Sequence, residues 1–322
     1  MRNVIGIATL AFVSVGAIGV LAGEADAPPP WAYPVNPPGT QPAVDDGTAR
    51  HVPGSTKAFT LTQLRDLFNV PDWHPDDHPA MPEAVAHGPR PGVFACGFCH
   101  LPNGLGRPEN SSLAGLPAAY IEQQVADFKS GARKSSERGS LPIALMIGVA
   151  KGATDAEVKA AAEYFAALKP KPWIRVVETD IVPKTRVAGW MLVSAASGGT
   201  EPIGQRIIEM PENLERTELR DAASGFVAYV PVGSIETGAE LVTTGGAGKT
   251  IPCAICHGPD LKGLGPVPSL AGRSPSYIVR QLYDIQHGVR NGTWGELMKA
   301  VVAKLSEEDM VSIATYTASL AP

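Results

Sequence analysis

The sequence Cys-Gly-Phe-Cys-His at positions 96–100 returns as Cys-Ala-Ile-Cys-His at positions 253–257 of the 322-residue chain, and these two stretches contain all four cysteines. The spacing Cys-x-x-Cys-His is typical of covalent haem c attachment. Each thiol adds across a vinyl group of the porphyrin to form a thioether, and the histidine that follows binds the iron. The sequence therefore predicts two covalently bound haem c groups, attached through Cys96, Cys99, Cys253 and Cys256, with His100 and His257 as iron ligands.

Other uses of four cysteines explain this pattern less well. Two Cys-x-x-Cys pairs 157 positions apart, each followed directly by histidine, match no usual spacing of a zinc site. A thioredoxin-like pair needs a strand-helix-strand pattern around it, and the sequence has none there. Disulfides between the pairs would leave both histidines unexplained.

The N-terminal segment predicts export from the cytoplasm. Arg2 precedes an uncharged apolar run over residues 4–21. This run fits a signal peptide over residues 1–22 and is also close to the minimum length of a spanning helix, so a cleaved signal and a retained membrane anchor both remain open. Residues 23–59 are rich in proline and predict a semi-rigid linker. We expect a periplasmic protein, soluble after cleavage or tethered to the inner membrane.

The amino-acid composition constrains the possible partners and compartment less tightly than the motifs do. A formal net charge of −5 and a pI near 5.8 argue against a nucleic-acid partner, which favours a basic surface. An oxidising compartment would convert spare cysteines to disulfides, so a chain whose cysteines are all committed to haem fits that compartment.

An internal repeat organises the chain. Cys253 lies 157 positions after Cys96, and the same offset pairs many other residues, namely Gly88 with Gly245, Gly106 with Gly263, Tyr120 with Tyr277, Gln124 with Gln281 and Arg133 with Arg290. The offset then falls to 152, because the first copy has extra residues around 134–141, and Met146 pairs with Met298. The repeat predicts two copies of one fold, over residues 60–170 and 234–322.

Helical periodicity supports that division. Apolar residues recur at helical spacing over 118–129 and over 276–286. A capping box of Thr154 and Glu157, and a weaker one of Ser306 and Asp309, begin the last predicted helix of each copy.

Two methionines are candidates for the remaining axial position of each iron. A methionine at helical spacing is more often core than ligand, as we expect for Met310. Met146 and Met298 are instead predicted outside the regular helices, at equivalent places in the two copies. We predict Met146 and Met298 as the sixth ligands, which makes the metal ligands His100, Met146, His257 and Met298.

The second copy resembles a class I cytochrome c domain of the cytochrome c4 type. After its Cys-x-x-Cys-His the resemblance runs through Leu261-Lys262-Gly263-Leu264-Gly265, Pro268-Ser269-Leu270-Ala271-Gly272, Tyr277, Arg280-Gln281-Leu282, Gly288-Val289-Arg290, Met298 and Leu305-Ser306-Glu307-Glu308-Asp309. The first copy is similar from Cys96 to Leu168. The resemblance implies a mainly α fold of two tandem class I cytochrome c domains. It also implies an N-terminal helix, around 82–87 and 235–243, that crosses the C-terminal helix near Tyr164 or Tyr316.

Residues 171–233 depart from that family, whose domains are joined by a short linker. Runs of β-branched and aromatic residues at 173–177, 187–193 and 226–230 predict a small β-containing insert. Two roles stay open for it: a brace that fixes the two domains relative to each other, and a docking surface for a partner.

A cluster of histidines and carboxylates at 72–79 is a second departure. His74 and His78 lie among three aspartates, but Pro75 and Pro79 break any helix that would align them, so a solvated loop is favoured over a metal site.

The predicted ligands indicate electron transfer. Histidine on one side of an iron and a thioether sulfur on the other leave no open position for a substrate, and such an iron exchanges one electron. We predict a periplasmic dihaem carrier of electrons in a respiratory chain, with redox proteins as partners. It acts as a free carrier between a dehydrogenase and an oxidase or reductase, or as the cytochrome subunit of the dehydrogenase.

The alternative class is an enzyme. A dihaem cytochrome c peroxidase needs one open haem, usually formed by releasing a histidine, which would require His74 or His78 in place of Met146. A thiosulfate-oxidising dihaem enzyme typically uses an additional cysteine ligand, and the chain has no fifth cysteine. We therefore expect no catalytic residues.

Overall fold

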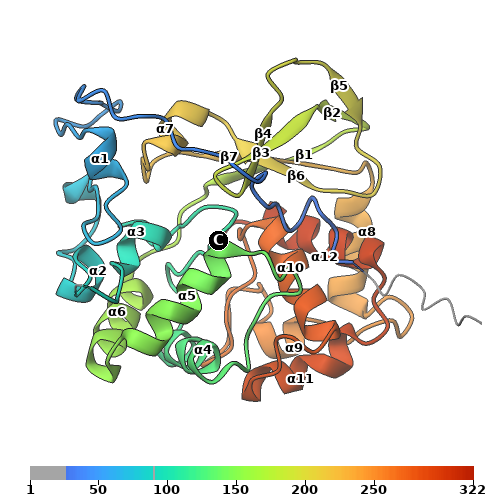
Figure 1. The fold of residues 1–322 in the computed structure, drawn as a ribbon. Helices are drawn as coiled ribbons and strands as arrows, with labels where there is room; N and C mark the ends of the chain where they lie inside the picture. The colour runs from blue at the N-terminus through green and yellow to red at the C-terminus, as the bar shows by residue number, and fades with distance from the viewer. Residues whose placement is uncertain (1–26, 90) are drawn as a thin grey trace, which may run out of the picture.

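A computed structural model describes residues 27–89 and 91–322 of the chain. Figure 1 shows two groups of helices with a group of strands at one end of the molecule. The predicted signal or anchor at 1–22 lies outside the described residues. In the part that is described, no helix is both long and apolar enough to cross a bilayer. The expected mainly α architecture with a small β-containing insert is confirmed, whereas the domain limits 60–170, 171–233 and 234–322 stay predictions.

The first half of the chain forms short helices around an apolar core. They are α1 (Leu61–Leu64), α2 (Glu83–Ala86), α3 (Cys96–His100), α4 (Ala118–Ser130), α5 (Leu141–Gly152) and α6 (Asp155–Ala167), with a single 3-10 turn at Pro75–Asp77. The predicted capping box begins α6, where Thr154 accepts a hydrogen bond from the Glu157 amide and the Glu157 side chain accepts from the Thr154 amide. Helix α6 buries Phe165 against α4 and α2.

The second half repeats this arrangement with a longer first helix. Its helices are α8 (Ser234–Thr244), α9 (Ala254–His257), α10 (Pro275–Gln286), α11 (Thr293–Val302) and α12 (Glu307–Ser319). The second capping box, Ser306 with Asp309, is also formed. Met310 is fully buried in α12, as expected of a core methionine.

Helices α8 and α12 cross at a glycine. A methyl group added at Gly238 would lie 2.0 Å from the Ser312 carbonyl oxygen and 2.7 Å from the Cβ atom of Tyr316. The crossing near Tyr316 is thus the one that the family resemblance implied, and it requires a residue without a side chain.

We expect Gly238→Ala to lower the free energy of unfolding by about 1–3 kcal/mol, because the added methyl group forces the two backbones apart. Denaturant unfolding of the haem-loaded protein measures the change. Gly148→Ala is the matched control, since no atom lies within 4 Å of its added Cβ and alanine favours the helix α5 that contains it. Equal stability of the Gly238 variant and the natural protein would contradict the close crossing.

The insert is built from short strands. They are β1 (Ile174–Glu178), β2 (Ile181–Pro183), β3 (Thr185–Ala188), β4 (Met191–Ser194), β5 (Thr200–Pro202), β6 (Ile208–Pro211) and β7 (Phe226–Val230), with the short helix α7 (Leu214–Glu218) between β6 and β7. Strand β7 is central in a three-stranded sheet, parallel to β1 and antiparallel to β6. Strands β2 and β5, and β3 and β4, form two antiparallel pairs.

The insert contacts both helical halves. From β6, the Glu209 carboxylate accepts hydrogen bonds from the hydroxyls of Ser274 and Ser276 at the start of α10. After α7, the Leu219 carbonyl accepts from the Trp73 indole at 2.7 Å, and α7 lies near α1 in Figure 1. These contacts favour the brace over a free docking surface as the role of residues 171–233.

Candidate functional site

The predicted haem residues gather in two cavities, one in each helical half. Cys96, Cys99, His100 and Met146 line the first, and Cys253, Cys256, His257 and Met298 line the second. The cavities hold about 1530 and 1510 Å³ of space outside atoms, part of it open to solvent. All eight residues that the sequence singled out are thus brought together in two groups of four.

A short helix presents each attachment motif. Helix α3 contains Cys96, Cys99 and His100, and a residue with positive φ ends it, Leu101 at 62°. In the second copy the equivalent position is Gly258, at 84°. The chain reverses direction after each histidine, so the loop that follows returns to the imidazole ring of that histidine.

That loop fixes the orientation of each histidine. Nδ1 of His100 lies 2.8 Å from the Ser111 carbonyl oxygen, and Nδ1 of His257 lies 2.8 Å from the Pro268 carbonyl oxygen. A carbonyl only accepts, so Nδ1 carries the proton and Nε2 keeps its lone pair for a metal. Burial lowers the pKa of both histidines, which keeps them neutral.

Burial acts on the cysteines too. It raises the pKa of Cys96 to about 12 and that of Cys253 to about 11, so both are neutral thiols before any attachment. All four cysteines are free of disulfides.

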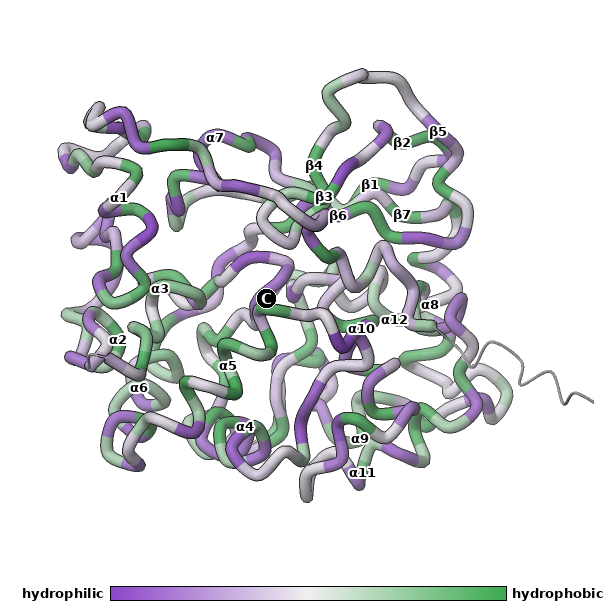
Figure 2. The backbone as a smooth tube through the Cα atoms, in the orientation of Figure 1, coloured by the Kyte–Doolittle hydropathy of each residue, from purple (hydrophilic) through white to green (hydrophobic). Residues whose placement is uncertain are grey.

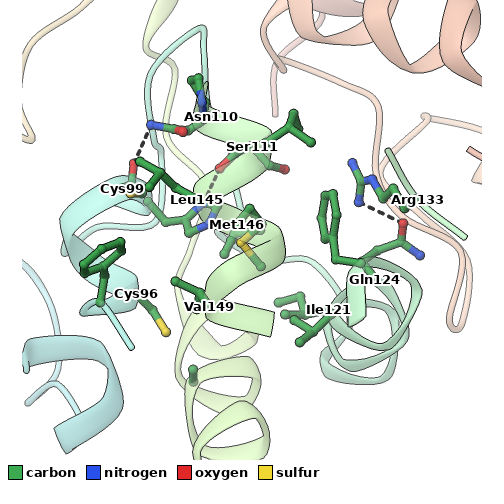
Figure 3. A pocket seen from close by; sticks show the side chains of 18 of the residues that line it. Cys96, Cys99, Asn110, Ser111, Ile121, Gln124, Arg133, Leu145, Met146 and Val149 are labelled. Atoms are coloured by element: carbon green, nitrogen blue, oxygen red, sulfur yellow. Dashed lines mark hydrogen bonds between the residues drawn. The ribbon is translucent and has the colours of Figure 1, made fainter. Parts of the chain in front are cut away.

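The methionines enter from helices on another wall of each cavity. Figure 3 shows Met146 and Val149 of α5 between the wall with Cys96 and Cys99 and the wall with Ile121 and Gln124. Figure 2 shows α5 as a largely apolar helix, as expected beside an apolar cavity.

The prediction that both methionines lie outside regular helices is wrong. Met146 is in α5 and Met298 is in α11. Pro142 and Gly148 suggest a loop in the sequence, but Pro142 falls in the first turn of α5, where a proline costs no hydrogen bond.

The histidines of the 72–79 cluster lie elsewhere. His74 Nε2 pairs with Asp221 at 2.9 Å, and His78 contacts Asp72 at 3.2 Å and the Tyr164 hydroxyl at 3.1 Å. Among the residues lining the two cavities, the histidines are His100 and His257. The arrangement that a peroxidase would need, with His74 or His78 in place of Met146, is therefore not found in residues 27–89 and 91–322.

The donors in each cavity fit a covalent haem. Two free thiols stand beside a neutral histidine with an available Nε2, and a thioether sulfur lines the same apolar space. Bound there, the group would supply a one-electron couple.

Comparison with known proteins agrees with this geometry. The chain is 28% identical over 245 residues to the thiosulfate dehydrogenase electron acceptor of Thiomonas intermedia (strain K12), covering 74% of the chain and 84% of that protein. It is 26% identical over 230 residues to the cytochrome c4 of Azotobacter vinelandii, covering 70% and 84%. No model of a known protein family matches the sequence.

A shorter relative is decisive. The cytochrome c-554(548) of Halomonas halodenitrificans (strain ATCC 12084 / NCIMB 8669) is 37% identical over 75 residues, which cover 90% of that protein and 23% of this chain. The chain belongs to the c-type cytochromes. It is a dihaem electron-transfer cytochrome that resembles the cytochrome c4 family, with two covalently bound haem c groups.

The two cavities of the cytochrome share a wall. Tyr120, Tyr277, Ser111 and Gln281 line both. Near this wall the backbone amide of Lys134 donates to the Val289 carbonyl at 2.9 Å, and that of Asn291 donates to the Ala132 carbonyl at 2.8 Å. In the repeat Lys134 is equivalent to Asn291, and Ala132 is equivalent to Val289. The two hydrogen bonds are therefore equivalent to each other, and the halves meet across an approximate twofold axis.

Two arginines complete the shared wall. Arg133 donates to the Tyr277 hydroxyl at 2.9 Å and to Oε1 of Gln124 and Gln281, both at 2.8 Å. Its repeat partner Arg290 donates to the Tyr120 hydroxyl and to the same two glutamines. Burial opposes ionisation of Tyr277, but the two guanidiniums outweigh it and lower the pKa of this tyrosine to about 8.

The sequence did not assign a function to this network. The repeat paired Arg133 with Arg290 and Tyr120 with Tyr277, and that pairing was the available signal. A twofold contact brings equivalent residues of two copies together.

Proposed function

We propose that the cytochrome holds its haems through Cys96 and Cys99 in the first domain and Cys253 and Cys256 in the second. His100 and Met146 are the axial ligands of one iron, and His257 and Met298 those of the other. The observation that supports this most directly is that each cavity contains a Cys-x-x-Cys-His motif and a methionine from a different helix. With both axial positions filled, no position is left for a substrate, so the protein transfers electrons and has no catalytic residues.

We place the protein in the periplasm, as a mediator between a dehydrogenase and a terminal oxidase or reductase. Two relatives are named thiosulfate dehydrogenase electron acceptors, which supports a dehydrogenase as donor and makes thiosulfate dehydrogenase the first donor to test. The same function is served by a free carrier and by a cytochrome subunit of the dehydrogenase. Residues 4–21 anchor the protein if they are retained, and mass spectrometry of the mature N-terminus distinguishes an anchor from a cleaved signal.

The protein's own residues set the conditions for transfer. The cavity linings are largely apolar, and the carbonyls of Ser111 and Pro268 hold the two histidines in one tautomer. The shared wall of Tyr120 and Tyr277 keeps the cavities adjacent.

Absorption spectroscopy of the oxidised protein tests the ligand assignment. We expect the weak red charge-transfer band of sulfur-ligated ferric haem at the intensity of two haems, and a redox titration with two one-electron steps. A band of half that intensity, together with high-spin features, would reject the carrier in favour of a peroxidase with one open haem.

A further inference from the structure

One buried guanidinium in the second domain binds the loops that follow both attachment motifs. Nη1 of Arg273 donates to the Ser112 carbonyl at 2.7 Å, and Nη2 donates to the Ala114 carbonyl at 3.2 Å, both in the first domain. Within the second domain, Nε donates to the Ser269 carbonyl at 2.9 Å and Nη2 to the Ser269 hydroxyl at 2.6 Å. The planar fork of an arginine can bind two loops at once in this way.

In the first domain the bound loop orients His100. Ser112 comes directly after Ser111, whose carbonyl oxygen lies 2.8 Å from Nδ1 of His100. Inside its own domain this stretch is held by the Leu113 amide, which donates to the Gly104 carbonyl at 2.7 Å. The guanidinium adds a second attachment, from the other domain.

The second domain has the equivalent arrangement. Ser269, the repeat partner of Ser112, comes directly after Pro268, whose carbonyl oxygen lies 2.8 Å from Nδ1 of His257. Arg273 therefore contacts each loop one residue beyond the carbonyl that orients its histidine.

The backbone on either side of this arginine is fixed. The residue before it, Gly272, donates its amide to the Thr317 carbonyl of α12 at 2.9 Å. The residue after it, Ser274, donates its hydroxyl to the Glu209 carboxylate of β6 at 2.7 Å. The side chain thus starts from a position that both α12 and the insert hold in place.

The link between the two loops is made once, from the second domain. Arg273 belongs to the residues that line the second cavity and is not among those that line the first. Its repeat partner is the apolar Leu116. Burial lowers the pKa of Arg273 to about 10, so the guanidinium stays protonated at pH 7 and keeps every N–H donor. These donors reach His100 only through the Ser112 loop, whereas the charge of the side chain would be kept by a lysine.

We propose that Arg273 is a positioning residue that ties together the loops holding the two axial histidines, so that it fixes the orientation of His100 as well as that of His257. This inference rests on the proposed function, in which both histidines bind iron, and adds to it a structural link between the two haem sites. Each Nδ1–H keeps its acceptor only while its loop stays against the imidazole ring, and the guanidinium holds both loops there.

Hydrogen exchange of the two Nδ1 protons, followed by NMR of the haem-loaded ferrous protein, tests the proposal. Each proton is assigned by its proximity to Ser111 or Pro268. These protons exchange when the loop in front of them opens, and the loss of a hydrogen bond from a charged donor makes such opening about tenfold more frequent. In Arg273→Met we therefore expect both protons to exchange at least about tenfold faster.

Arg273→Lys separates the fork from the charge. A lysine ammonium keeps the charge but ends one bond short of the two Nη atoms that reach the first domain, while it still reaches Ser269. We expect the His100 proton to exchange about tenfold faster in this variant and the His257 proton to stay close to its natural rate. If Arg273→Met does not take up haem, Arg273→Lys alone decides.

Gly238→Ala is the control for lost stability, because that glycine lies at the crossing of α8 and α12 and lines neither cavity. Backbone amides in the middle of α12 should exchange faster in this control, and both histidine protons should keep their natural rates.

A natural exchange rate at His100 in Arg273→Met or in Arg273→Lys would overturn the proposal, because Arg273 would then act within the second domain or through its charge. Equal acceleration of the histidine protons in Gly238→Ala would also overturn it, since the protons would then exchange by global unfolding. The proposed function fails by a separate result, the absence of two one-electron steps in a redox titration of the natural protein.

Discussion

Replacing Met298 by alanine is expected to remove half of the red charge-transfer band of the oxidised protein and to lower one of its two reduction potentials. Met298 is in α11, and it lines the same cavity as Cys253, Cys256 and His257. A thioether favours ferrous iron, so its loss stabilises the ferric form and leaves an open position on that iron. Band intensity and potentiometric titration measure the two effects.

Met146→Ala is expected to have the same effect on the other haem, since Met146 lines the first cavity with His100. Met310→Leu is the matched control, because that methionine is fully buried in α12 and lines neither cavity. In Met310→Leu the charge-transfer band and both reduction potentials should stay as in the natural protein. Unchanged spectra in Met298→Ala or Met146→Ala would mean that another residue holds the sixth position of that iron.

Local sequence predicted the parts of the fold that depend on short-range interactions. The capping boxes of Thr154 and Ser306 could be predicted from the sequence because each forms hydrogen bonds between two residues that are only three positions apart. The attachment motifs could be predicted from the sequence because the covalent chemistry of haem attachment fixes the spacing of their cysteines and histidine. In contrast, the helices around Met146 and Met298 were missed, since Pro142 lies in the first turn of α5, where it costs no hydrogen bond, and Gly295 lies in the first turn of α11.

Long-range features were beyond local sequence reasoning. The pairing of β1 with β7 joins residues 174 and 226 in parallel, and no pattern within either strand specifies that partner. Likewise, nothing near Arg220 in the sequence indicates that its guanidinium donates to the carbonyl of Phe98, which lies 122 positions earlier.

Arg133→Met is expected to destabilise the protein by disrupting the hydrogen-bond network at the shared wall. This substitution removes the donor to the Tyr277 hydroxyl and one of two donors to each of Gln124 and Gln281. Arg133 is buried, so water replaces it poorly and the affected acceptors stay undersatisfied. We expect the free energy of unfolding of the loaded protein to fall by about 2–4 kcal/mol, measured by denaturant titration. Arg186→Met, an exposed arginine of the insert, should change it by less than about 0.5 kcal/mol.

The pair Arg133 and Arg290 is expected to be non-additive. Each guanidinium donates to Oε1 of both Gln124 and Gln281, so after one substitution each glutamine still has one donor. The second substitution removes the last of these donors from the buried Gln124 and the half-buried Gln281, which costs more than the first. The double variant should therefore lose more stability than the sum of the single variants, by about 0.5–3 kcal/mol in a double-mutant cycle. Additive losses would mean that the two arginines do not share these acceptors, and that the twofold contact between the domains is held by other residues.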